Sequence, residues 1–123
     1  MKKINAMLFW VLGLTAWIQA QHFYLHPFYN SNILRVYDLE NETQVSGITD
    51  IALPQAAGPN NVVVFKNRVF VSKDLGSSGL ILVYDLATLT SGVPITTINL
   101  SNMAIGLAVD PATGDLYVPT FKW

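Results

Sequence analysis

The tetrapeptide Val-Tyr-Asp-Leu occurs twice in this chain of 123 residues, at 36–39 and again 47 residues later at 83–86. The match extends well beyond these four letters, because residues 33–53 and 80–100 align without a gap and are identical at nine of 21 positions. A period of roughly 40 to 50 residues is typical of β-propellers, in which each repeat forms one four-stranded sheet. The repeat therefore predicts an all-β chain of stacked antiparallel sheets.

The same offset divides the rest of the chain into strands. Short runs rich in Val, Ile, Thr, Tyr and Phe predict strands at 22–25, 33–38, 48–53, 61–65, 68–72, 80–85, 95–100, 105–110 and 115–119. The first three are the second to fourth strands of one blade (21–53), the next four form a complete blade (60–100), and the last two begin another (104–119). The chain thus contains about two to two and a half four-stranded blades. A β-sandwich is the alternative, although a sandwich does not repeat a four-strand unit.

The N-terminus carries the pattern of a secretory signal peptide. Two lysines precede an apolar run at 6–18, and Ala20 precedes the expected cleavage point. An apolar helix of about 13 residues spans roughly 20 Å, which is short of the ~30 Å hydrocarbon layer, so we expect cleavage and not retention as a membrane anchor. Residues 1–20 are then the signal peptide, and the mature segment 21–123 is secreted or periplasmic.

Charge and cysteine content narrow the range of partners. The mature segment has five basic and eight acidic residues and no basic cluster, which argues against nucleic acid as a ligand. The chain has no cysteine, so core packing and not disulfide bonds must hold an exported domain of this size together.

Two segments resemble a known group of repeats. The sequence GLAVDPATGDLYV at 106–118 resembles the inner hairpin of NHL-type and SMP-30/gluconolactonase-like six-bladed propellers, and LILVYDL at 80–86 resembles the third strand of the same blades. The resemblance covers most of 21–123 and implies an N-terminal partial propeller. It also implies that further blades, or self-association of copies, cover the two open end faces.

The resemblance implies one candidate metal site. In lactonase-like relatives, Asn, Asp and Glu oxygens at the mouths of the inner strands hold a divalent cation, and Asn60 and Asn61 precede an inner strand here. A hard cation such as Ca²⁺ takes about six oxygen ligands, and the equivalent pair Ala104-Ile105 has no side-chain oxygen. We therefore expect a turn-forming asparagine pair with no cofactor, and a divalent cation such as Ca²⁺ is the alternative.

The other polar residues are expected to have structural roles. Asp38 and Asp85 end matching strands, and an aspartate that recurs in every repeat is expected to accept hydrogen bonds from a turn, as is Asp110. His22 and His26 would lie about 13 Å apart along a strand, too far to share a metal ion, so we expect surface or turn histidines.

Two sequons, at Asn41 and Asn99, could carry glycans in a eukaryotic host, and Asn41 is the better candidate because it falls in a predicted loop. The chain contains no serine-hydrolase elbow, zinc-protease motif or nucleotide-binding loop. These features predict an exported propeller module or fragment that acts as a binding scaffold for a protein or glycan partner and has no catalytic activity. The alternative function is part of an SMP-30/lactonase-like hydrolase, in which a bound divalent cation activates water.

Overall fold

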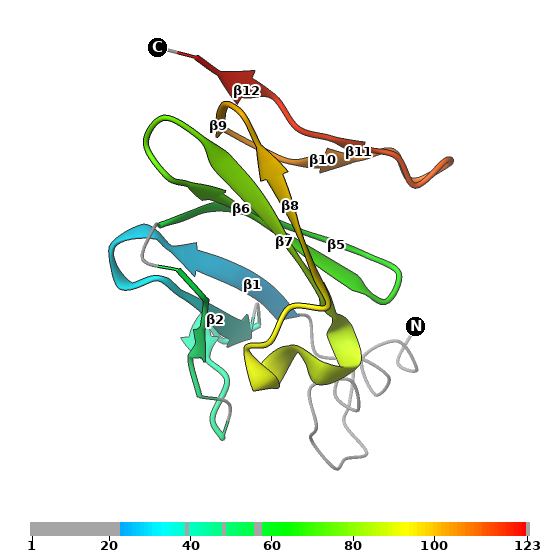
Figure 1. Ribbon diagram of the computed structural model, residues 1–123. Coiled ribbons are helices and arrows are strands. Elements are labelled where there is room, and N and C mark those ends of the chain that lie inside the picture. The colour runs from blue at the N-terminus through cyan, green and yellow to red at the C-terminus, as the bar shows by residue number, and fades with distance from the viewer. Residues whose placement is uncertain (1–22, 39, 48, 56–57, 123) are drawn as a thin grey trace.

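The computed structural model describes residues 23–38, 40–47, 49–55 and 58–122. This part of the chain consists mostly of antiparallel β-sheets, which confirms the predicted all-β class (Figure 1). The expected signal peptide and His22 lie outside the described residues. Across the described ranges, no helix is long and apolar enough to cross a bilayer.

The first sheet is centred on strand β2 (Ile33–Asp38). Strand β1 (Phe23–Phe28) pairs with β2 over its whole length, and the two are joined by the 3₁₀ turn η1 (Tyr29–Ser31). On the other edge of β2, the short strands β3 (Thr43–Gln44) and β4 (Ile51–Ala52) pair with opposite ends.

The fourth strand predicted at 48–53 is wrong in its extent. Of the residues 49–53 that the structure describes in that range, Ile51–Ala52 form a strand, and the pairing near the far end of β2 is made instead by Thr43–Gln44. The chain between them turns at Gly47, whose φ of 79° lies in the left-handed region and interrupts an extended strand. Ile51 in β4 and Leu53 just after it are both buried, so this segment contacts the core through these two residues.

The second sheet contains the four strands that the sequence predicts between 61 and 100. They run in the order β5-β6-β7-β8 and are β5 (Pro59–Phe65), β6 (Arg68–Asp74), β7 (Gly79–Asp85) and β8 (Thr96–Leu100). A 3₁₀ helix, η2 (Leu86–Ser91), connects β7 to β8.

The last segment is a long hairpin made of two short strand pairs. Strand β9 (Met103–Ala104) pairs with β12 (Thr120–Phe121), and β10 (Ala108–Val109) pairs with β11 (Leu116–Tyr117). The sequence predicts two continuous strands here, but the ladder is interrupted at Pro119, which has no N–H to donate.

The first two sheets pack face to face around the larger hydrophobic core. From the first sheet this core takes Leu34, Val36, Ile51 and Leu53, and from the second sheet and η2 it takes Val69, Val71, Leu80, Leu82, Tyr84, Leu86 and Leu89. All of these side chains are buried. Burial of this many aliphatic and aromatic groups is the main force that holds the two sheets together.

The opposite face of the second sheet packs against the terminal hairpin. Ile81, Val83 and Ala104 are the buried residues of this smaller core, with Phe70, Leu100, Leu107, Leu116 and Val118 packed against them. Consecutive residues of β7 point to opposite faces, and six of its seven residues are buried, so this strand lies inside the stack (Figure 1).

The sequence repeat recurs in the packing. A shift of 47 places Val69 and Val71 of β6 on Leu116 and Val118, and each pair faces the sheet that precedes it in the chain. The second sheet therefore packs on the first, and the terminal hairpin on the second sheet, through side chains at equivalent positions of the repeat.

Candidate functional site

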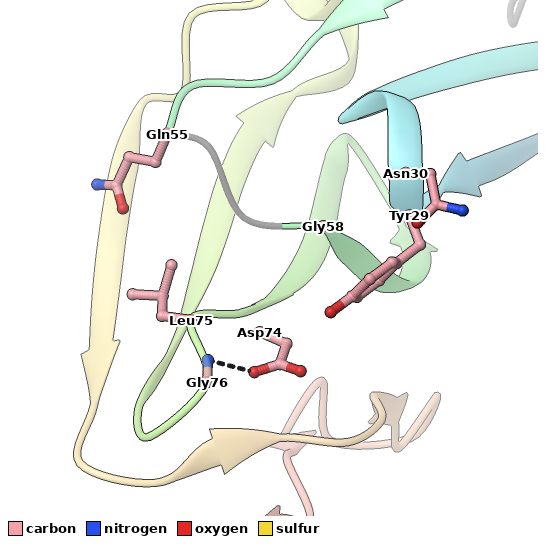
Figure 2. Close-up of a pocket in the computed structure, with 7 residues that line it drawn as sticks. All are labelled: Tyr29, Asn30, Gln55, Gly58, Asp74, Leu75 and Gly76. Carbon is pink, nitrogen blue, oxygen red and sulfur yellow. Dashed lines mark hydrogen bonds between the residues drawn. The ribbon is translucent and has the colours of Figure 1, made fainter.

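An open pocket of about 590 Å³ lies where three connections meet, at one end of the first two sheets. They are η1 after β1, the residues Gln55 and Gly58 ahead of β5, and the loop between β6 and β7 (Figure 2). The lining residues are Tyr29, Asn30, Gln55, Gly58, Asp74, Leu75 and Gly76. The volume lies within the range of ligand sites in proteins, about 300 to 1,000 Å³.

Tyr29 and Asp74 bring the aromatic ring and the charge to this pocket. The Tyr29 ring packs on Gly58, where an added Cβ would lie only 2.4 Å from ring atom Cδ2, so residue 58 must be glycine for the ring to keep this place. The Tyr29 hydroxyl points to the side of the pocket where Asp74 lies (Figure 2). One oxygen of Asp74, Oδ1, accepts a hydrogen bond of 2.6 Å from the Gly76 N–H.

A buried lysine lies beneath this pocket. Lys73 is fully buried, and its Nζ donates to the Asn32 side-chain oxygen at 2.6 Å and to the carbonyls of Pro54 and Gln55 at 2.5 and 2.6 Å. All three acceptors are neutral. Three hydrogen bonds use every donor of an ammonium group, which is the condition for burying one.

Asn32 connects the segments around Lys73. Its side-chain amide donates to the carbonyls of Leu53 and Gln55 at 2.8 and 2.7 Å, and its own N–H closes η1 by donating to the Phe28 carbonyl. The backbone of Asn32 has a φ of 53°, a left-handed conformation that asparagine tolerates better than most residues.

One buried cluster supports the wall of the pocket. It consists of Lys73, Asn32 and the carbonyls of Pro54 and Gln55, and we call it the Lys73 cluster. Asn32 ends the turn that carries Tyr29, the Gln55 carbonyl accepts from both Asn32 and Lys73, and Asp74 directly follows Lys73. Gln55 itself has a φ of 65°, a strained value for this residue, which those two hydrogen bonds hold in place. The Lys73 cluster therefore fixes three separate parts of the lining relative to one another.

The buried titratable groups Lys73 and Tyr84 predict a maximum of stability near pH 10. Burial lowers the pKa of Lys73 to about 8 and raises the pKa of Tyr84 to about 12. Above pH 8 the unfolded chain binds more protons at Lys73 than the folded chain, so the free energy of unfolding rises with pH. Above pH 10 the folded chain keeps the Tyr84 proton that the unfolded chain loses, so the free energy of unfolding falls.

We expect a rise of about 2 kcal/mol between pH 8 and pH 10. Urea denaturation at half-unit steps of pH measures this profile. Lys73→Met should remove the rise and Tyr84→Phe should remove the fall. A wild-type profile that is flat from pH 8 to pH 10 would show that the Lys73 pKa is not lowered.

The candidate metal residues Asn60 and Asn61 lie at the start of β5, where the register shifts between Pro59 and Asn61 and leaves Asn60 without a partner in register. The Asn60 amide nitrogen donates to the Ala104 carbonyl at 2.9 Å, which joins the second sheet to the terminal hairpin. Asn61 is paired in register with Ser72, whose buried hydroxyl has no hydrogen-bond partner among the described residues. Within the described ranges, no three His, Cys, Asp or Glu side chains are grouped as metal ligands would be.

The three aspartates predicted to hold turns do so. Asp38 Oδ1 accepts from the N–H two residues ahead, that of Glu40, at 2.8 Å, and Asp85 and Asp110 accept in the same way from Ala87 and Ala112 at 2.9 and 2.8 Å. Hydrogen bonds from the Asn41 side chain and then from the Glu40 N–H lower the pKa of Asp38. Hydrogen bonds from the Ala87 N–H and then from the Arg68 side chain lower the pKa of Asp85.

His26 lies on the exposed outer face of the first sheet, as expected of a surface histidine. Its ring touches those of Tyr24, Phe28 and Tyr37, and the two tyrosines stack with centroids 5.2 Å apart. Arg35 lies 4.7 Å from the centre of the Phe28 ring and forms a two-point ion pair with Asp50. We use the name outer aromatic face for the surface formed by Tyr24, His26, Phe28, Arg35, Tyr37 and Asp50.

The two sequons lie in different settings. Asn41 is exposed in the loop between β2 and β3, and its amide nitrogen donates to Asp38 Oδ2 at 2.8 Å. Asn99 is exposed on β8, the outermost strand of the second sheet.

Sequence reasoning did not find the pocket or its support. The sequence does contain one indication of Lys73's role. Lys73 lies two residues after the buried Val71 and so shares its inward face of β6. A lysine is rare at such a position unless its amine has buried hydrogen-bond partners. The partners of Lys73 could not be read from the sequence, because they are 18 to 41 residues away along the chain.

Comparisons with family models, curated proteins and solved structures each found no match to this chain.

Proposed function

We propose that this protein is an exported, non-catalytic binding module built from stacked sheets of the β-propeller blade type, and that the pocket beside Tyr29 and Asp74 is its binding site. The blade assignment is supported by the 47-residue repeat, by the four-stranded order β5-β6-β7-β8, and by the contact that recurs on both faces of that sheet. Export is supported by the signal-like pattern of residues 1–20.

One observation carries the choice of site, namely the support of the pocket lining by the Lys73 cluster. Three segments that are far apart in the chain meet at the pocket, and one fully buried amine with three hydrogen bonds fixes them. Burying an amine costs several kcal/mol unless it is fully hydrogen-bonded. Such a cluster at the base of an open pocket fits a binding site whose walls must keep their geometry.

The outer aromatic face is the second surface that could take part in binding. The repeat aligns its Tyr24, Arg35 and Tyr37 with Val71, Leu82 and Tyr84 of the second sheet, which are covered by the first sheet. Tyrosine, phenylalanine and arginine are enriched in protein interfaces. We propose that a further sheet of the same type, from this chain or from another copy, packs on this face.

The proposal is tested by a fragment screen monitored by NMR on the isotopically labelled protein, purified after expression with its own leader. We expect fragments to shift the amide signals of Asn30, Asp74, Leu75 and Gly76. Shifts confined to Tyr24 and Tyr37 would move the binding site to the outer aromatic face. A screen with no localised shifts at either surface would overturn the proposal.

A further inference from the structure

The charge that lines the pocket indicates what kind of ligand it takes. Asp74 is the one carboxylate among the lining residues. The residue before it in the sequence, Lys73, carries the opposite charge and could in principle neutralise it. Lys73 is fully buried, however, because successive side chains of a strand point to opposite faces. Its amine donates to three oxygens, of Asn32, Pro54 and Gln55, on the face of β6 opposite to Asp74. The pocket therefore presents a negative charge and no accessible positive charge, which excludes an anionic ligand and favours a cation.

The hydrogen-bonding capacity of the lining favours the same conclusion. The side chains of Tyr29, Asn30, Gln55 and Asp74 each have an oxygen that can accept. Across the described residues, no hydrogen bond or ion pair is found for the second carboxylate oxygen of Asp74 or for the Tyr29 hydroxyl. An ammonium group has three donors and no acceptor, so a site rich in acceptors matches it.

Asp74 also favours an ammonium over a guanidinium. Its Oδ1 already accepts from the Gly76 N–H at 2.6 Å, so Oδ2 has the greater free capacity to accept from a ligand. A guanidinium is held best by both oxygens of a carboxylate in a parallel two-point contact, whereas an ammonium is a point charge that one oxygen satisfies. The Tyr29 ring adds a surface that attracts a cation.

We propose that the pocket binds a primary ammonium group, that of a lysine side chain on a protein partner, with Asp74 as the anionic contact. This inference rests on the proposed function and names the partner chemistry for the same site.

The test is a calorimetric and NMR titration of the purified protein with Nα-acetyl-lysine amide as the probe. We expect a dissociation constant on the order of 1 mM, as suits one charged contact in an open pocket. Binding should weaken as the salt concentration is raised from 20 to 500 mM. Asp74→Asn should weaken it about 10- to 100-fold, since a hydrogen bond to a charged group is lost.

Asp115→Asn is the matched control, because it removes the same charge from an exposed turn outside the pocket and should leave the affinity unchanged. Asn at position 74 keeps an oxygen for the Gly76 N–H, so the loop should stay folded, which the amide spectrum checks. Nα-acetyl-arginine amide should bind more weakly than the lysine probe.

Four outcomes would overturn this inference. Tighter binding of the arginine probe would exclude an ammonium site, equal binding of Nα-acetyl-glutamine amide would exclude a charged one, and retention of affinity in Asp74→Asn would remove the anionic contact. Absence of lysine-probe binding would exclude it as well. If the fragment screen still locates ligands at the pocket, only the ammonium assignment fails; if the screen is also empty, the proposed function fails with it.

Discussion

Replacing Asn32 with alanine is expected to lower the free energy of unfolding by about 4 kcal/mol. The substitution removes the hydrogen bond to the buried Lys73 ammonium and the two donors to the carbonyls of Leu53 and Gln55. It also puts alanine at a φ of 53°, which costs roughly 1 kcal/mol. Since domains of this size are stable by about 5 to 15 kcal/mol, much of the total would be lost. Urea denaturation followed by circular dichroism measures the change.

Two control variants separate the causes of this loss. Asn32→Gly tolerates the positive φ but makes no side-chain hydrogen bond, so it should lose about 3 kcal/mol and isolate the contribution of the Lys73 cluster. Asn67→Ala changes an exposed asparagine at the opposite end of the β5–β6 hairpin and should change the stability by less than about 0.5 kcal/mol. If Asn32→Ala were as mild as Asn67→Ala, the Lys73 cluster would not support the fold.

The second large effect is expected at Leu82, in the interior of the larger core. Leu82 is fully buried on the face of β7 that packs against the first sheet. Truncation to alanine removes that contact and leaves a cavity, so we expect Leu82→Ala to cost about 3 kcal/mol. Thermal and urea denaturation measure this cost, and hydrogen exchange of β1 and β2 amides should accelerate with it, because the two sheets share one core.

Ile98→Ala is the matched control for this variant. Ile98 is also a six-carbon aliphatic residue in the second sheet, but it lies on the edge strand β8 and is 45% exposed. Its truncation should cost about 1 kcal/mol or less. Equal effects of the two substitutions, or unchanged exchange of the first sheet in Leu82→Ala, would mean that the sheets do not stack as described.

The stability of the stack and the geometry of the pocket depend on the same residues. Lys73 belongs to strand β6, between the buried Val69 and Val71 and the pocket residue Asp74, which ends the strand. A change that separates the first sheet from the second therefore also moves Tyr29 relative to Asp74, because the two residues come from different sheets. Binding at the pocket should for the same reason stabilise the packed sheets against unfolding.

Much of the strand architecture could be predicted from the sequence. The gapless repeat and the short runs of strand-forming residues predicted the strands that became β2, β5, β6, β7 and β8, and the aspartates at strand ends were predicted to hold turns. The failures fall where local pattern carries little information. The outer strand at 48–53 was shortened because its neighbour Gly47 turns the chain, and the last hairpin was divided at Pro119.

The candidate site was beyond prediction for a different reason. Tyr29, Gln55 and Asp74 carry no shared motif, and the group that holds them together is a lysine whose acceptors include two backbone carbonyls, which any residue provides. Asn60 and Asn61, chosen from a resemblance, lie at the junction with the terminal hairpin and apart from this pocket.

The sequence by itself determined the period of the chain, the antiparallel strands and which side chains of each strand share a face, because a two-residue alternation is a local property of the backbone. Only the tertiary structure decided which of those faces are covered, where Lys73 finds its three oxygens, and that Tyr29 and Asp74 meet at one pocket. These contacts join residues up to 41 positions apart, and they exist only because two sheets stack and bring their connecting loops to the same end.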